Sequence, residues 1–226
     1  TLSNGKFEFD ESWPMVTELN VDLLFENEGL YMVSDHARIL DVTVNDVTAD
    51  IPYLGEGAIL DIEVNGRTTG TLATGLVQAS SLQNSVGQAL DFVQVSGPLD
   101  LEVQLTIPLT GLDIQVKGDV GFNNNPIYMP DLDIHLVQTQ GRLSFHNDDI
   151  SAENINAHLW GQPVQIKFDG AQGEEAYQAN VNMQAEWDAD KLAQDYHKQL
   201  DPYLDGTAKW SADLALTLPE LSLIHI

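Results

Sequence analysis

The stretch that decides the fold is Gly97–Pro108, GPLDLEVQLTIP. From Leu99 to Ile107 its apolar residues alternate with polar ones, which is the two-residue period of a β-strand with one apolar and one polar face. At about 3.3 Å per residue, this period predicts a strand about 30 Å long. Because similar alternation recurs through most of the chain, the sequence predicts a mainly β fold.

Charge and composition exclude several classes of protein. The 226 residues include 35 acidic and 9 basic ones, for a net charge of −26. Nucleic-acid binding is excluded because neutralising phosphates requires clustered Lys and Arg. The absence of cysteine excludes disulfide scaffolds, thiolate metal sites and cysteine nucleophiles. The chain opens at Thr1 without Met, ends on the apolar tail 221–226 and has no apolar run long enough to span a membrane, so we interpret it as an internal fragment of a longer protein.

The order of the expected elements suggests an internal repeat. A helix is expected where Leu72, Leu76, Ala79 and Leu82 follow helical spacing, and a second over residues 188–203 with Asp188 as its N-cap. The Asn- and Pro-containing segment 123–126 is expected to break the chain between strands. We therefore predict two β-groove repeat units, residues 1–110 and 111–226, in one continuous elongated sheet. Three residue pairs recur at an offset of 111 or 112 positions: Pro14 and Pro126, Gly29 and Gly141, Pro108 and Pro219.

The width of such a sheet constrains its shape. Each unit has about five strands, and at about 4.8 Å per strand two units extend about 48 Å. An antiparallel sheet of this width must curl or split. Because two short helical connections cannot cover about ten strands, we expect a long, twisted, curled antiparallel sheet with an apolar trough, a closed barrel being the other possibility.

Three segments resemble a known family. WPMVTELNVDLLFENEGLYM (13–32), SGPLDLEVQLTIPLTGLDIQVKGDV (96–120) and DGTAKWSADLALTLP (205–219) are similar to parts of the YhdP family of AsmA-like bridge proteins of Gram-negative bacteria. The resemblance implies a repeating β-groove in the periplasm that shields phospholipid acyl chains between the inner and outer membranes. It also implies adjoining repeats in the same parent chain and an anchor in the inner membrane.

The expected groove lining consists of apolar residues that share one face of their strands. Exposing a lipid tail to water costs about 0.8 kcal/mol of free energy for each CH₂, and an aliphatic lining avoids this cost. The expected lining residues are Leu19, Val21, Leu23, Leu60, Ile62, Val64, Leu99, Leu101, Val103, Leu105, Ile107, Ile114, Val116, Leu132, Ile134, Leu143, Phe145, Val164, Ile166, Phe168, Val181, Met183, Trp210, Leu214 and Leu216.

The carboxylates and histidines that could act in catalysis or bind a metal are better explained as residues of solvated strand faces. The carboxylate pairs Asp61/Glu63, Asp100/Glu102 and Asp131/Asp133 lie on the polar period of predicted strands and are expected on a solvated face. His135, His146 and His158 lack metal-ligand spacing, although neighbouring strands could bring them together. We expect no catalytic residue, cofactor or metal, and the sequence favours a non-enzymatic protein.

Two other functions remain open on the sequence alone. One is a structural or adhesive β-repeat module with a closed core and no lipid path. The other is a carbohydrate-active β-sandwich enzyme, in which tryptophans such as Trp187 and Trp210 would stack against sugars. An apolar trough open to solvent would distinguish the lipid-path interpretation from the structural one.

Overall fold

The fold is known from a computed structural model that describes residues 1–8, 10–84, 86–111, 113–174, 176–191, 206–218 and 224–225. The strands are β1 (Leu2–Phe7), β2 (Val16–Glu26), β3 (Gly29–Ile39), β4 (Val42–Val44), β5 (Asp46–Ile51), β6 (Ile59–Thr69), β7 (Gln94–Val95), β8 (Pro98–Pro108), β9 (Gln115–Met129), β10 (Ile134–His146), β11 (Asp149–Leu159), β12 (Gln162–Gln172), β13 (Tyr177–Asp188), β14 (Thr207–Leu218) and β15 (Ile224–His225). The helices are α1 (Gly70–Gln78) and α2 (Val86–Phe92), with 3₁₀ turns η1 (Ser81–Asn84) and η2 (Pro130–Leu132).

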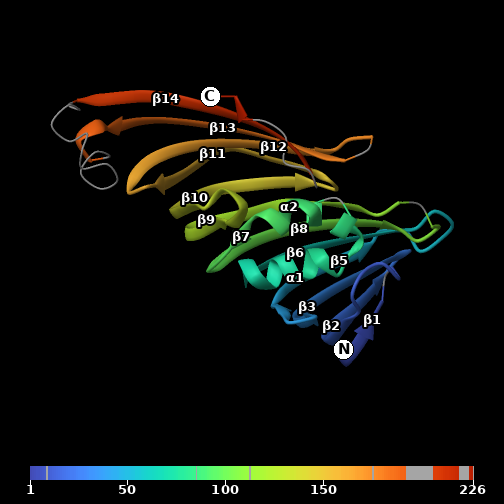
Figure 1. The fold of residues 1–226 in the computed structure, drawn as a ribbon. Coiled ribbons are helices and arrows are strands. Elements are labelled where there is room, and N and C mark those ends of the chain that lie inside the picture. The colour runs from blue at the N-terminus through green and yellow to red at the C-terminus, as the bar shows by residue number, and fades with distance from the viewer. Residues whose placement is uncertain are drawn as a thin grey trace.

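All strands of the described residues join a single antiparallel sheet. The main path runs β1-β2-β3-β5-β6-β8-β9-β10-β11-β12-β13-β14-β15, with β4 beside β3 and β7 beside β9. The sheet twists and curves along this path without closing on itself, and both helices lie on one of its faces (Figure 1). The predicted long, curled antiparallel sheet is therefore confirmed.

The strand of Gly97–Pro108 lies near the middle of the sheet. As β8 it pairs with β6 from Pro98 to Pro108, and with β9 from Leu99 to Thr106. Neighbours on both sides satisfy its backbone hydrogen bonds, and its side chains alternate between the two faces of the sheet. The alternation in the sequence therefore correctly predicts both the strand and its two faces.

The predicted break at residues 123–126 is wrong, because β9 continues through this segment. Asn124 has a positive φ of 66° and the pairing of β9 with β10 shifts register beside it, which together indicate a β-bulge. The buried Asn125 side chain supplies hydrogen bonds within the segment: its Oδ1 accepts from the backbone N–H of Asn123 at 2.7 Å. Polar turn residues here bend the strand rather than end it.

The first helical connection is confirmed, with more helix than expected. Thr69 caps α1 by accepting a hydrogen bond at its side chain from the backbone N–H of Leu72. A second helix, α2, which the sequence pattern does not predict, follows after η1. Leu132 lies in η2 rather than in a strand, and Asp131 and Asp133 lie in η2 and at its C-cap, so their assignment to a strand face is wrong.

The second expected helix is described only at its start. Asp188 ends β13, and its carboxylate accepts a hydrogen bond from the backbone N–H of Asp190 at 3.1 Å, as an N-cap does. The rest of the expected helix, residues 192–203, lies outside the described residues. The division into units 1–110 and 111–226 stays a prediction.

Candidate functional site

The candidate site is the apolar face of the sheet, called the inner face below. Cross-strand partners point to the same face, so the register defines it. One row of partners runs Ala49–Ile62–Leu105–Val116, and another runs Val64–Val103–Gly118–Phe145. On the C-terminal strands, Ile155 pairs with Ile166 and Ile166 with Met183. The inner face thus continues across the sheet from β5 to β13.

The structure brings most of the expected lining residues onto this face. Pairing or packing places the following there: Val21, Leu23, Leu60, Ile62, Val64, Leu99, Leu101, Val103, Leu105, Ile107, Ile114, Val116, Ile134, Leu143, Phe145, Val164, Ile166, Phe168, Val181, Met183, Trp210, Leu214 and Leu216. Two are placed differently: Leu132 lies in η2, and Leu19 pairs with Gly5 between two register shifts in β1 and β2.

Exposure changes strongly along the inner face. On β10 and β12, Leu136 and Val164 are only 4% and 2% exposed, and they belong to a cluster that extends from β9 to β14. Near the N-terminus, Leu23 is 41% and Phe25 is 68% exposed. The curled C-terminal strands pack their apolar side chains against one another, whereas the end of β2 leaves Leu23 and Phe25 open to water.

Helix α2 covers one end of the inner face. Val86 is buried in a cluster with Ile150, Tyr177 and Ala179, and Phe92 packs against the same cluster. The candidate lining set missed Val86, Ile150, Tyr177 and Ala179. The two-residue alternation from Tyr177 to Trp187 was the signal that could have added Tyr177 and Ala179, but no local pattern predicts that α2 lies against them.

Tryptophans mark the other end of the C-terminal strands. The ring centroids of Trp187 and Trp210 lie 4.6 Å apart, and those of Trp160 and Trp187 lie 5.8 Å apart, both in edge-to-face geometry. The Trp187 indole N–H donates to the backbone oxygen of Pro163 at 2.8 Å. Trp187 and Trp210 therefore pack within the apolar cluster, as their position on the apolar period predicts.

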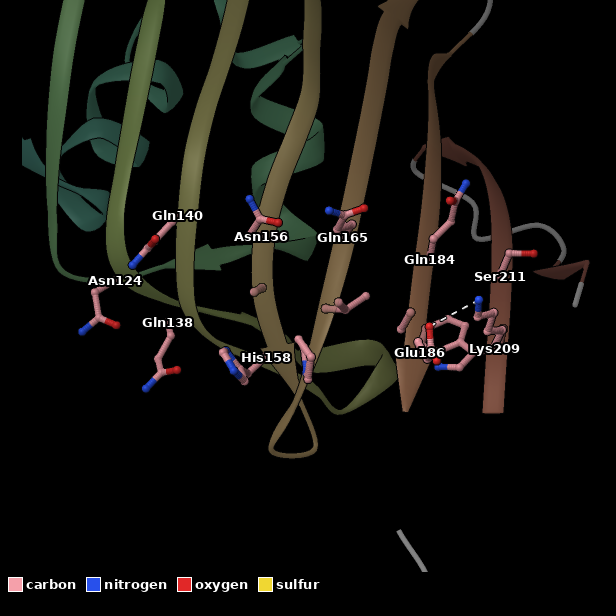
Figure 2. Close-up of a pocket in the computed structure, with 15 residues that line it drawn as sticks. Asn124, Gln138, Gln140, Asn156, His158, Gln165, Gln184, Glu186, Lys209 and Ser211 are labelled. Atoms are coloured by element: carbon pink, nitrogen blue, oxygen red, sulfur yellow. Dashed lines mark ion pairs between the residues drawn. The ribbon is translucent and has the colours of Figure 1, made fainter. Parts of the chain in front are cut away.

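The opposite face is polar and carries a hollow of about 1050 Å³ over β9–β14. A row of exposed polar side chains crosses it in register: Gln140, Asn156, Gln165, Gln184 and Ser211 (Figure 2). Below this row, Glu186 and Lys209 form an ion pair at 3.4 Å (Figure 2). Pro163, Val164 and Trp210 also contribute to the lining of the hollow. We assign the hollow to the solvated face because the row of exposed polar side chains across it is free to hydrogen-bond water.

The carboxylates on β6 and β8 also belong to the polar face, as expected. The Asp61 carboxylate accepts a hydrogen bond from the Thr106 hydroxyl at 2.7 Å, and Arg67 pairs with Asp100 at 2.9 Å. Arg142 pairs with Glu102 at 3.2 Å and with Asp119 at 3.4 Å, and these carboxylates raise the pKa of its guanidinium. Arg67 and Arg142 thus offset part of the negative charge of these carboxylates on a surface open to water.

The described histidines do not form a cluster. His135 stacks on Tyr128 with ring centroids 4.2 Å apart, His146 pairs with Lys117, and His158 pairs with Pro163. Within the described part of the chain, no group of three or more His, Asp or Glu side chains is placed to hold a metal ion. In that same part, no helix combines the length and apolarity needed to cross a membrane.

Comparison with known proteins fits this open, repetitive sheet. The sequence model of the YhdP protein family matches residues 1–224. The chain belongs to the YhdP family. One relative, the "Intermembrane phospholipid transporter YhdP" of Escherichia coli (strain K12), is 31% identical over 219 residues, which are 96% of this chain. The chain spans 17% of that relative's length, and no solved structure matches it.

Proposed function

We propose that the inner face is part of a hydrophobic path that shields phospholipid acyl chains during transport between the inner and outer membranes. The observation that carries this proposal is the continuity of the inner face: from β5 to β14, the rows of described partners on it contain no Asp, Glu, Lys or Arg. An acyl chain on such a wall avoids the cost of about 0.8 kcal/mol for each CH₂ in water. The named activity of the E. coli relative supports phospholipid as the cargo.

The same proposal implies where the chain lies in the cell and what adjoins it in the parent protein. A path between two membranes places it in the periplasm, with adjoining repeats of a longer parent continuing the sheet beyond β1 and β15 and with an anchor in the inner membrane elsewhere in the parent. The path needs no catalytic residue and no cofactor, because sliding a lipid along an apolar wall breaks no covalent bond.

One observation favours a second function, a structural β-repeat with a closed core. The inner face over β10–β13 is packed rather than open: Leu136, Val164 and Trp187 are 4%, 2% and 5% exposed. A dry, filled core would need no lipid. The two functions differ in whether the packed side chains move apart to admit an acyl chain.

Native mass spectrometry of the chain purified without detergent distinguishes these functions. We expect bound phospholipid in the unmodified chain, and a severalfold loss of it in Val103→Asp, because the new charge faces the path. Gln104→Asp is the matched control, since Gln104 is the next residue and points to the polar face. A chain that carries no lipid and takes up none from vesicles would support the closed core instead.

A further inference from the structure

Residues 70–97, called the strap below, leave the sheet and return to it at one place. The backbone N–H of Gly70 donates to the carbonyl oxygen of Gly97 at 3.0 Å, which ties the two ends together. Near its end, β7 pairs with β9, and the Asn125 side chain donates to the carbonyl oxygens of Ser96 and Pro98 at 2.8 Å each. The base of the strap is therefore firmly fixed to the middle of the sheet.

The far part of the strap reaches a distant strand. Helix α1 contacts β6, whereas α2 contacts β13, and four strands lie between β8 and β13 in the sheet. At about 4.8 Å per strand, this separation is about 24 Å along the sheet. The strap thus reaches across the inner face from β6 to β13, with both helices on the same face (Figure 1).

The strap is weakly held where it meets β13. Helix α2 has seven residues, too few for a helix to be stable by itself. Its side-chain hydrogen bonds from Gln78, to the Gly87 carbonyl and to Asp91, tie it to α1 and not to β13. In the cluster that receives α2, the Tyr177 hydroxyl is buried without a hydrogen-bond partner. Burial, together with Asp148 and Asp149, raises the pKa of Tyr177. An unpaired buried hydroxyl destabilises this contact relative to an apolar one.

We infer that the strap is a gate on the lipid path: α2 rests against β13 when the path is empty and is displaced when an acyl chain takes its place. The inference rests on the proposed lipid path. The apolar surface that α2 covers, formed by Ile150, Tyr177, Ala179 and Leu216, continues the inner face of β11–β14, so an acyl chain and α2 compete for the same side chains. Because its base is fixed, the strap returns to β13 when the acyl chain has passed.

Hydrogen–deuterium exchange tests the gate, with phosphatidylcholine vesicles carrying a photoactivatable phosphatidylcholine as the probe. Their zwitterionic surface does not repel a chain of net charge −26. We expect crosslinked lipid on the inner face and, in the same sample, severalfold faster exchange in α2 with unchanged exchange in β8 at the base. Crosslinked lipid without a change in α2 overturns the gate and leaves the proposed path intact.

Two variants change the gate in opposite directions. Ala89→Glu places a charge in the apolar contact and should speed lipid uptake severalfold, whereas Gln83→Glu, which adds the same charge at an exposed position of the strap, should not. Tyr177→Phe removes the unpaired hydroxyl and should slow exchange in α2 about tenfold and slow lipid uptake, while Tyr53→Phe at an exposed tyrosine leaves both unchanged. If neither the unmodified chain nor Ala89→Glu takes up lipid, the gate and the proposed path both fail.

Discussion

The backbone N–H of Gly70 and the carbonyl oxygen of Gly97 are joined by a hydrogen bond of 3.0 Å, although a complete helical segment separates these residues in the sequence. This bond closes the strap at its base. It makes α1 and α2 an excursion from the β6–β8 connection rather than a separate layer of the fold. The stability of the base and the displacement of α2 from β13 can therefore be tested separately.

A methyl group at Gly70 should weaken the base. A Cβ there would lie 2.1 Å from the backbone oxygen of Val95, so Gly70→Ala forces the backbone apart and should destabilise the chain by about 1–3 kcal/mol. Gly75 is the matched control in the same helix, because a Cβ there meets nothing within 4 Å and Gly75→Ala should stabilise by up to about 1 kcal/mol. Urea unfolding measures both changes, and equal effects would contradict the close contact at Gly70.

Removing the Asn125 side chain should lower the free energy of unfolding at least as much as Gly70→Ala does. Its amide donates to Ser96 and Pro98, and its Oδ1 accepts from the backbone of Asn123, all in a position with no solvent exposure. Asn125→Ala leaves these backbone groups unpaired and should lower the free energy of unfolding by about 3 kcal/mol. Asn123→Ala, at an exposed position two residues away, should change it by less than about 0.5 kcal/mol. Indistinguishable losses would show that Asn125 does not hold the strap.

The raised pKa of Tyr177 predicts a loss of stability at high pH. Burial keeps the phenol protonated in the folded chain above its ordinary pKa of 10.0, while the unfolded chain releases the proton near that value. The stability that the protonated Tyr177 phenol gives the folded chain is therefore fully present below about pH 10 and is lost as the pH rises above it. Urea midpoints between about pH 9 and about pH 11 should fall less in Tyr177→Phe than in the unmodified chain or in Tyr53→Phe. Parallel curves for all three would contradict the burial of this hydroxyl.

The two-residue period was sufficient to predict which residues share a face. It placed Val103, Ile166 and Met183 on one face and Gln104 and Lys167 on the other, as the register has them. This works because side chains in a paired strand must alternate, whatever lies beyond the sheet.

The sequence could not predict what covers each face. Nothing near Tyr177 indicates that Val86 packs in the same cluster, since that contact depends on how far the sheet curls. The same limit explains the wrong break near Asn125. The local residues are typical of a turn, but β10 pairs with Asn123 and Asn125, and β7 pairs with β9 directly after the segment, so the strand extends through it. Local signals were overridden wherever contacts distant in sequence supplied the missing hydrogen bonds.

The most direct test of the lipid path is site-specific photocrosslinking to phospholipid at adjacent residues of one strand. Ile166 is 7% exposed on the inner face, and its neighbour Lys167 lies exposed on the polar face, where it pairs with Glu153 at 3.2 Å. With a photoreactive amino acid at each position in turn, the path predicts strong lipid crosslinking at residue 166 and background at residue 167. Equal crosslinking at both positions, or none at residue 166, would contradict a lipid path along the inner face.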